Sequence, residues 1–311
     1  MSTEAADLHT AALVRSVPHT VRTTLETLVR REFWEHAALW WVPLGLGVLL
    51  LLAAMVSTVM GHQGAVLPKP MDEAMGLMIL NGSQFLFAAV IYLFTASVVT
   101  YYALDCLYAE RKDRSILFWK SLPVSDGLTV LSKFLVAVVV VPLIAFAAAL
   151  VSQLLGLVIW ELRVAAGGVP DVIRWDTLAW LRGELVILMI LALSSLWYAP
   201  LVAAFMLLSA WLRRGPPPWV WALIGPFVLA FFELVIFRTH YLWGFLRYRR
   251  TGIWTVLTHR DGHSVLDERM HVLGDFNWAA AFTDIDLWLG VLAAAALLYA
   301  TLRVRRYRDD T

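Results

Sequence analysis

The chain has 311 residues, of which 60% are hydrophobic and only 16% are charged, and its mean hydropathy is +0.71. Soluble proteins have about 25% charged and 45–50% apolar residues, so this composition excludes a water-soluble globule and indicates a protein of the lipid bilayer. The 25 basic and 24 acidic residues nearly balance, which argues against nucleic-acid binding because no strongly basic face could neutralise phosphates. The single cysteine, Cys106, excludes an intramolecular disulfide framework and a cysteine-based zinc site.

The first predicted element is an amphipathic helix ahead of the first hydrophobic span. Its apolar residues recur at helical spacing, with arginines on the other faces: Val21, Leu25, Leu28, Val29 and Phe33. Aromatic residues at its exit suit the headgroup boundary of a bilayer. We therefore assign residues 1–36 to a cytoplasmic N-terminus and an interfacial connecting helix. A plain basic anchor beside a span is the alternative.

Six stretches are long and apolar enough to cross the bilayer, which requires about 20 residues in a helix. The spans are expected at residues 37–61, 77–104, 134–160, 185–212, 219–237 and 285–302. The expected fold class is therefore an all-α membrane protein, with a six-helix transmembrane domain over residues 37–302 and a cytoplasmic tail at 303–311. Prolines interrupt four of the spans and predict local bending: Pro43, Pro142, Pro200 and Pro226.

The distribution of Lys and Arg predicts the orientation. With the N-terminus inside, the inner segments hold fifteen basic residues and the outer segments ten, six of them in the long segment 238–282. Because long loops are translocated with little regard to charge, the short loops decide. We expect a multi-pass protein with both termini in the cytoplasm.

The outer segment 238–282 precedes the last span and is too long for a plain connector. Tyr241 to Trp254 could form a helix along the outer leaflet, where arginines would meet lipid phosphates. The histidine cluster of this segment contains a turn signal, Asp-Gly, and we interpret its members as solvated loop groups, with no metal site: His259, Asp261, His263 and His271.

Ionisable groups inside the spans are rare, and each costs at least ~2.5 kcal/mol at the bilayer centre, so it tends to face a cavity or a partner. Glu233 is the clearest case. It either reaches the interface or pairs with Arg238, or it lines a substrate path or a subunit seam. The same two interpretations apply more weakly to Gln153 and Glu184.

Motifs for catalysis are missing from the sequence. It has no G-x-x-x-x-G-K-[ST] phosphate loop, no G-x-G-x-x-G, no H-E-x-x-H and no G-x-S-x-G. We expect no catalytic residue and no cofactor in this chain. A lipid-modifying enzyme would need paired acidic or histidine groups, for which Asp284, Asp286 and His271 are the best candidates. A secondary carrier or channel would show inverted repeats and midplane charges. A membrane scaffold is the remaining alternative.

The loop between the second and third spans, residues 105–133, contains the strongest functional pattern. A charged stem is followed by an apolar cluster on the aqueous side, and exposed apolar patches rimmed by charge mark protein contacts. An interfacial helix resting on lipid is the alternative. Ser125 or Asp126 is expected to cap the helix of the third span. The predicted partner-binding residues are Glu110, Arg111, Asp113, Arg114, Ser115, Ile116, Leu117, Phe118, Trp119 and Lys120.

The stretch from Glu110 to Pro123 (ERKDRSILFWKSLP) resembles the coupling loop in the membrane subunit of type-2 ABC exporters, and Arg31 to Glu35 (REFWE) resembles the entry to its first span. The resemblance, closest to bacterial members, implies a permease of the bacterial inner membrane whose coupling helix docks into a separate ATPase. It implies two ATPase chains that hold ATP and Mg, a second permease copy in a homodimer or heterodimer, and export of a hydrophobic or amphipathic substrate. The outer segment is longer and more basic than in a minimal member of that family.

Overall fold

The computed structural model describes residues 21–60, 73–113, 115–116, 124–165, 177–212, 216–260, 263–264 and 276–307. In these ranges six helices are long and apolar enough to cross a membrane. Strands are limited there to an antiparallel pair of two residues each, β1 (His259–Arg260) and β2 (His263–Ser264). The expected fold class, an all-α membrane protein with six candidate transmembrane helices, is confirmed.

The helices follow one another along the chain as α2 (Val21–Glu35), α3 (Ala38–Met60), α4 (Glu73–Asp105), α5 (Tyr108–Lys112), α7 (Asp126–Leu135), the π-helix η2 (Val136–Val140), α8 (Val141–Ala165), α9 (Thr177–Trp211), α10 (Pro218–Phe237), α11 (Tyr241–Thr258), α12 (Trp278–Thr283) and α13 (Ile285–Tyr307). The candidate spans lie in α3, in α4 with α5, in the continuous α7–η2–α8, and in α9, α10 and α13. The third span starts earlier than expected because Ser125 caps α7, accepting a hydrogen bond from the Leu128 amide.

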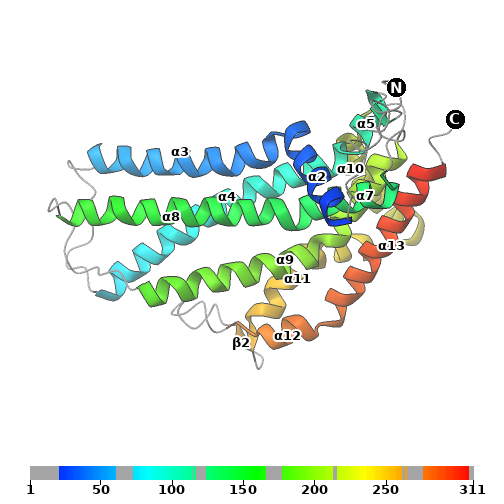
Figure 1. Cartoon of the computed structure of the whole chain (residues 1–311). Helices are drawn as coiled ribbons and strands as arrows, with labels where there is room; N and C mark the ends of the chain where they lie inside the picture. The colour runs from blue at the N-terminus through cyan, green and yellow to red at the C-terminus, as the bar shows by residue number, and fades with distance from the viewer. Residues whose placement is uncertain are drawn as a thin grey trace, which may run out of the picture.

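The long helices α3, α4, α8 and α9 form the bundle, and α13 lies along α9 (Figure 1). Small residues at the helix contacts, such as Ala88, Ala145 and Ala149, allow the backbones to approach closely, as is usual between helices in a membrane. The largest core cluster contains Tyr102 of α4 and Met206 of α9, and Val29 and Phe33 of α2 pack against it. The C-terminal part of the apolar face predicted for residues 21–35 therefore packs against protein, whereas Val21 at its start is exposed.

A π-helical turn precedes one of the four predicted bends. Proline has no N–H, so Pro142 cannot donate to the carbonyl of Val138 and its ring crowds that carbonyl. The chain widens into η2 directly before Pro142, the form in which α-helices commonly absorb such a defect. Pro43, Pro200 and Pro226 lie inside α3, α9 and α10.

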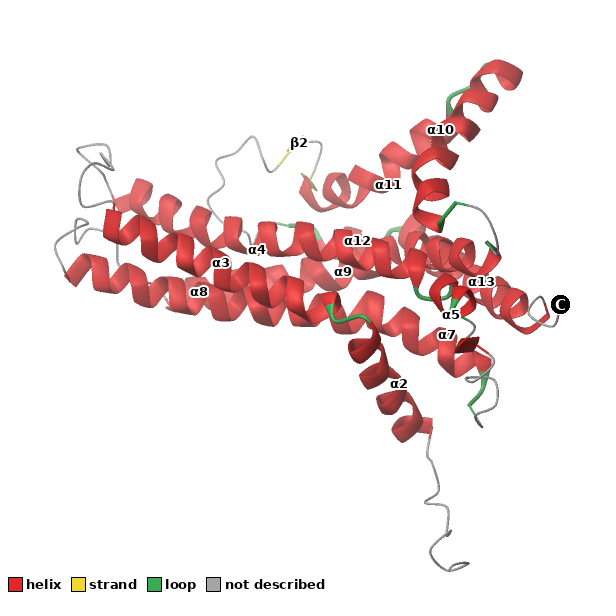
Figure 2. Cartoon of the chain, turned by 90° about the horizontal axis from the view of Figure 1, so that it is seen from above, coloured by secondary structure: helices red, strands yellow, loops and turns green. Residues whose placement is uncertain are grey.

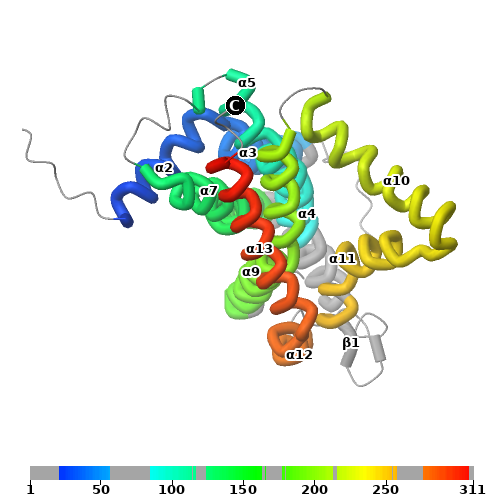
Figure 3. The backbone as a smooth tube through the Cα atoms, turned by 90° about the vertical axis from the view of Figure 1, so that its right-hand side faces the viewer, coloured from blue at the N-terminus to red at the C-terminus, as the bar shows by residue number. Residues whose placement is uncertain are grey.

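The helix α10 stands away from the bundle, and α11 returns from its far end toward α9 (Figures 2 and 3). The helix expected at Tyr241 to Trp254 is thus present as α11. It packs on the bundle, where the Trp197 indole donates to the Arg249 carbonyl at 2.7 Å and the Tyr198 hydroxyl donates to the Arg250 carbonyl at 3.1 Å.

Candidate functional site

Charged side chains from four helices meet at one end of the bundle, where α2, α5, α7 and the C-terminal end of α13 lie close together (Figure 1). We call this group the ion cluster, and its members are Arg31, Glu32, Glu110, Lys133 and Arg305. Lys133 is fully buried, and its ammonium lies 2.8 Å from Glu32 Oε1 and 3.1 Å from Glu110 Oε1. The cluster therefore joins segments that are far apart in the sequence.

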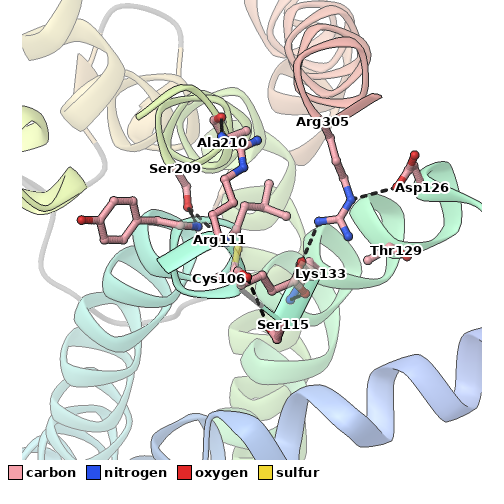
Figure 4. A network of polar contacts seen from close by, with 12 residues as sticks. Cys106, Arg111, Ser115, Asp126, Thr129, Lys133, Ser209, Ala210 and Arg305 are labelled. Atoms are coloured by element: carbon pink, nitrogen blue, oxygen red, sulfur yellow. Dashed lines mark hydrogen bonds and ion pairs between the residues drawn. The ribbon is translucent and has the colours of Figure 1, made fainter. Parts of the chain in front are cut away.

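Glu110 is the centre of the ion cluster. Its Oε1 accepts from Arg31 Nη2 at 3.0 Å, and its Oε2 accepts from Arg305 Nη1 at 2.7 Å. Arg305 also donates from Nε to Asp126 at 3.0 Å, and Figure 4 shows its guanidinium reaching from α13 toward α7. One carboxylate of the loop thus holds cations from α2, α7 and α13 at once.

A second buried carboxylate, Glu32, belongs to the ion cluster, and acidic residues at the edge of the cluster, Glu35 and Asp126, also contact two of its three cations. Glu32 is 1% exposed, and the Tyr102 hydroxyl donates to its Oε2 at 2.8 Å. Arg31 also pairs with Glu35 at 2.7 Å. Burial alone would lower the pKa of Arg31, but the surrounding carboxylates Glu35, Glu110 and Glu32 raise it above its ordinary value. Every charge of the ion cluster is therefore compensated, as buried ions require.

The same loop is also tied to α9. Ser209 Oγ accepts from the backbone amides of Leu107 and Tyr108, at 3.2 and 2.9 Å. The Arg111 guanidinium donates to the carbonyl of Ala210, and Figure 4 shows this side chain directed at α9. The junction between α4 and α5 is therefore fixed to the end of α9 as well as to the ion cluster.

His36 lies at the bend between α2 and α3. Its ring meets the Tyr102 ring edge-on, with centroids 5.0 Å apart. Burial lowers the pKa of His36 below its ordinary value, and the nearby Lys133 also lowers it, against the opposing effect of Glu32. His36 is therefore neutral at neutral pH and packs as an aromatic group.

Some of the predicted partner-binding residues lie in the described part of the loop, and the others lie outside it. Glu110 is buried in the ion cluster, Ile116 is 8% exposed, and the Ser115 hydroxyl donates to the Glu110 carbonyl. Asp113 is exposed at the end of α5. The remaining members lie outside the described residues: Arg114, Leu117, Phe118, Trp119 and Lys120. In the described part of the loop, Glu110 therefore contacts other helices of the same chain. The partner contact remains a prediction.

Glu233 has a structural role at the end of α10. Its carboxylate accepts from the Thr239 hydroxyl at 2.8 Å and from the backbone amides of Tyr241 and Leu242 at 2.6 and 2.9 Å. These amides open α11 and have no acceptor inside the helix. The side chain therefore caps α11 and fixes the turn at Arg238, which has a φ of 52°. A substrate path or subunit seam at Glu233 remains a prediction.

Gln153 and Glu184 form a polar pair between α8 and α9. Gln153 is 1% exposed and Glu184 is 7% exposed, and a side-chain hydrogen bond joins them. Within the described part of the chain, Glu184 Oε2 has no hydrogen-bond partner. This pair is a buried polar point in a mostly apolar bundle, and a substrate path or subunit seam at Gln153 remains a prediction.

The candidate metal and enzyme groups have other partners. Glu32, Glu35 and His36 bring possible ligand atoms within 4.8 Å of one another, but Lys133 and Arg31 already occupy the two carboxylates. The Tyr248 hydroxyl donates to Asp286, and Asp284 accepts from the Asp286 amide at the start of α13. Residues Asp261 and His271 lie outside the described residues, as do the side chains of His259 and His263.

Sequence reasoning missed Glu32, Lys133 and Arg305 as members of one site. A signal was present for Glu32, which follows Leu28 of the predicted apolar face by four residues. Lys133 and Arg305 follow buried but polar residues, Thr129 and Thr301, by four, so the apolar pattern did not mark them. Residues four apart share a helix face, so a charge there requires a buried partner.

Comparisons with models of known protein families, with curated proteins and with solved structures found no match to this chain.

Proposed function

We propose that this chain is the membrane-spanning permease subunit of an ATP-driven exporter of the bacterial inner membrane. ATP and Mg would be held by two separate ATPase chains, and the end of the bundle with the ion cluster would face the cytoplasm with both termini. The function rests on the resemblance of Glu110 to Pro123 to a coupling loop, and the contacts that the described part of that loop makes with the spans support it.

The observation that carries the proposal is the attachment of the loop to the ends of several spans. Glu110 joins α5 to α2, α7 and α13, and Ser209 joins the same loop to α9. Coupling between two sites requires an element whose equilibrium between two states both sites can bias. A force applied at residues 117–120 would act through α5 and α7 on α2, α9 and α13 together.

The exposure of α10 supports a second permease copy. Only Pro218, the first residue of this candidate span, is buried, and the exposed residues of the helix include Leu223, Phe227, Phe231 and Phe232. The helix also stands apart from the bundle in Figures 2 and 3. A span with little support from its own chain is suited to pack against another subunit, and the apolar path between two copies would take a hydrophobic or amphipathic substrate.

A secondary carrier that works without ATP is the second candidate, because Glu184 and Gln153 bury polar groups among the spans. Intramembrane ionisable groups commonly mark ion-coupled transport. Substrate movement in vesicles that contain the complex distinguishes the two functions. The exporter requires ATP, whereas the carrier requires only an ion gradient.

The test of the exporter is the effect of Phe118→Ala with Trp119→Ala. The purified wild-type complex should contain a P-loop ATPase identified by mass spectrometry, and the double variant should insert normally but lose most of that ATPase. Trp243→Ala with Phe245→Ala is the matched control, because both residues are exposed aromatics of α11. Unchanged ATPase recovery in the Phe118 and Trp119 variant, or no P-loop ATPase with the wild type, would refute the proposal.

A further inference from the structure

An open apolar groove lies where α2 turns into α3. Its volume is about 440 Å³, and it is lined by Phe33, Trp34, Ala37, Trp40 and Ile144. Small-molecule sites range from about 300 to 1,000 Å³, so the groove is large enough for part of an organic ligand. Its walls come from α2, from the bend after it, from α3 and from α8.

The wall residues give the groove the chemistry of a lipid chain site. Every lining side chain is apolar or aromatic, and Trp34 remains 81% exposed although it is a large aromatic. Tryptophan is enriched at the boundary between headgroups and hydrocarbon. The groove lies at the start of α3, a candidate span, so it opens at the depth where headgroups meet acyl chains.

A cation stands beside the groove. Arg30 precedes Phe33 by three residues and Trp34 by four, a spacing that places these residues on one face of α2. Other arginines of this helix are paired, Arg22 with Glu26 and Arg31 with Glu35. Among the residues that the structure describes, Arg30 is exposed and forms no ion pair. The guanidinium is therefore available to an anionic group above the groove.

We propose that this groove binds an anionic phospholipid, with an acyl chain against Trp34 and Trp40 and the phosphate at Arg30. Arginine binds phosphate oxygens through two parallel hydrogen bonds, and the apolar walls remove chain area from water and headgroups. The lipid belongs to the leaflet on the side of the ion cluster. This site is additional to the proposed export function and does not depend on an ATPase.

The first experiment measures headgroup preference. The full chain is reconstituted in nanodiscs with equal amounts of phosphatidylglycerol and phosphatidylcholine of the same acyl chains, then extracted, and the retained lipids are counted by native mass spectrometry. Wild type is expected to retain phosphatidylglycerol about fivefold over phosphatidylcholine, because the attraction between one basic residue and an anionic headgroup corresponds to about that ratio. Arg30→Gln should abolish the preference. Arg22→Gln, which removes an exposed arginine of the same helix, should leave it unchanged.

The second experiment tests the groove itself. Ala37→Phe fills the space and should lower retention of both lipids, whereas Ala38→Phe enlarges an equally exposed neighbouring alanine that does not line the groove. A photo-crosslinking residue in place of Trp34 should give adducts with the mass of a phospholipid. Equal headgroup preference in wild type and Arg30→Gln, or adducts to a polypeptide in place of lipid, would overturn the proposal. Thermal unfolding in detergent checks that all variants fold.

Discussion

At the scale of single residues, most buried charges described above have a partner from another helix. Glu110 contacts three cations, Lys133 contacts two carboxylates, and the Tyr102 hydroxyl donates a hydrogen bond to Glu32. Removing one member of such a group leaves an uncompensated buried charge, which costs more than the intact group contributes. The ion cluster therefore specifies one arrangement of the helix ends.

Glu110→Gln is expected to destabilise the protein by about 3–5 kcal/mol, the usual cost of breaking a buried pair, because it removes the charge shared by Arg31, Lys133 and Arg305. Unfolding in detergent measures the change. Glu26→Gln breaks an exposed pair with Arg22 and should cost less than about 1 kcal/mol. Similar losses in the two variants would contradict the central role of Glu110.

His36 is expected to make the stability of the protein fall as the pH falls. Burial lowers the pKa of His36 in the folded protein, so as pH falls below about 6.5 the unfolded chain takes up a proton that the folded chain does not. Stability from this group is complete above that pH and is lost below it. Thermal unfolding between neutral and mildly acidic pH should show a smaller decline for His36→Gln than for wild type. Parallel curves would contradict this assignment.

At the scale of elements, close approach is decided by glycines at particular contacts. A Cβ at Gly252 of α11 would lie 2.9 Å from the Trp197 ring of α9 and 3.0 Å from the Tyr248 ring. The Trp197 indole also donates to the Arg249 carbonyl there. At Gly244, on the same helix, an added Cβ would meet no neighbouring atom within 4 Å. Alanine at Gly252 therefore tests packing, whereas alanine at Gly244 tests helix propensity alone.

Gly252→Ala should destabilise the protein by about 1–3 kcal/mol, the cost of an added methyl group in a well-packed contact. Gly244→Ala should be neutral or stabilising by up to about 1 kcal/mol, because alanine favours the helix. Unfolding in detergent compares the two variants. Equal effects would show that α11 is not held closely against α9.

At the scale of the whole molecule, both ends of α13 are held by other helices, whereas α10 is the candidate span that its own chain buries least. Asp286 accepts from Tyr248 of α11 at one end, and Arg305 enters the ion cluster at the other. The helix α13 makes its principal contact with α9 between these points. The bundle and α13 therefore form one unit, and α10 is the span with the least support from its own chain.

Cysteines on the exposed face of α10 should form intersubunit disulfides if this helix contacts a second copy. Phe227→Cys and Phe231→Cys lie one turn apart on that face, and Leu292→Cys on α13 is a control of similar exposure. Oxidation in native membranes, read by gel electrophoresis without reductant, should give a dimer from the α10 positions. Equal dimer yield from Leu292→Cys would indicate random collision. The native Cys106 is buried.

The sequence by itself determined the six segments that can cross a membrane. A span is a local property, because its backbone must be satisfied within the segment, although the helix of the third span begins at Asp126, before its apolar run. The cap at Ser125 and the helix beginning at Tyr241 also followed from short-range patterns.

Only the tertiary structure decided which charges belong together. Glu110 was expected to face a partner, yet it lies among Arg31, Lys133 and Arg305, which are between 23 and 195 residues away along the chain. Glu233 caps the next helix by accepting from the amides of Tyr241 and Leu242, a contact that the pattern within its own span did not indicate. Such pairings depend on how helices cross in space, and the pattern along a single helix contains no information about the opposite side of the contact.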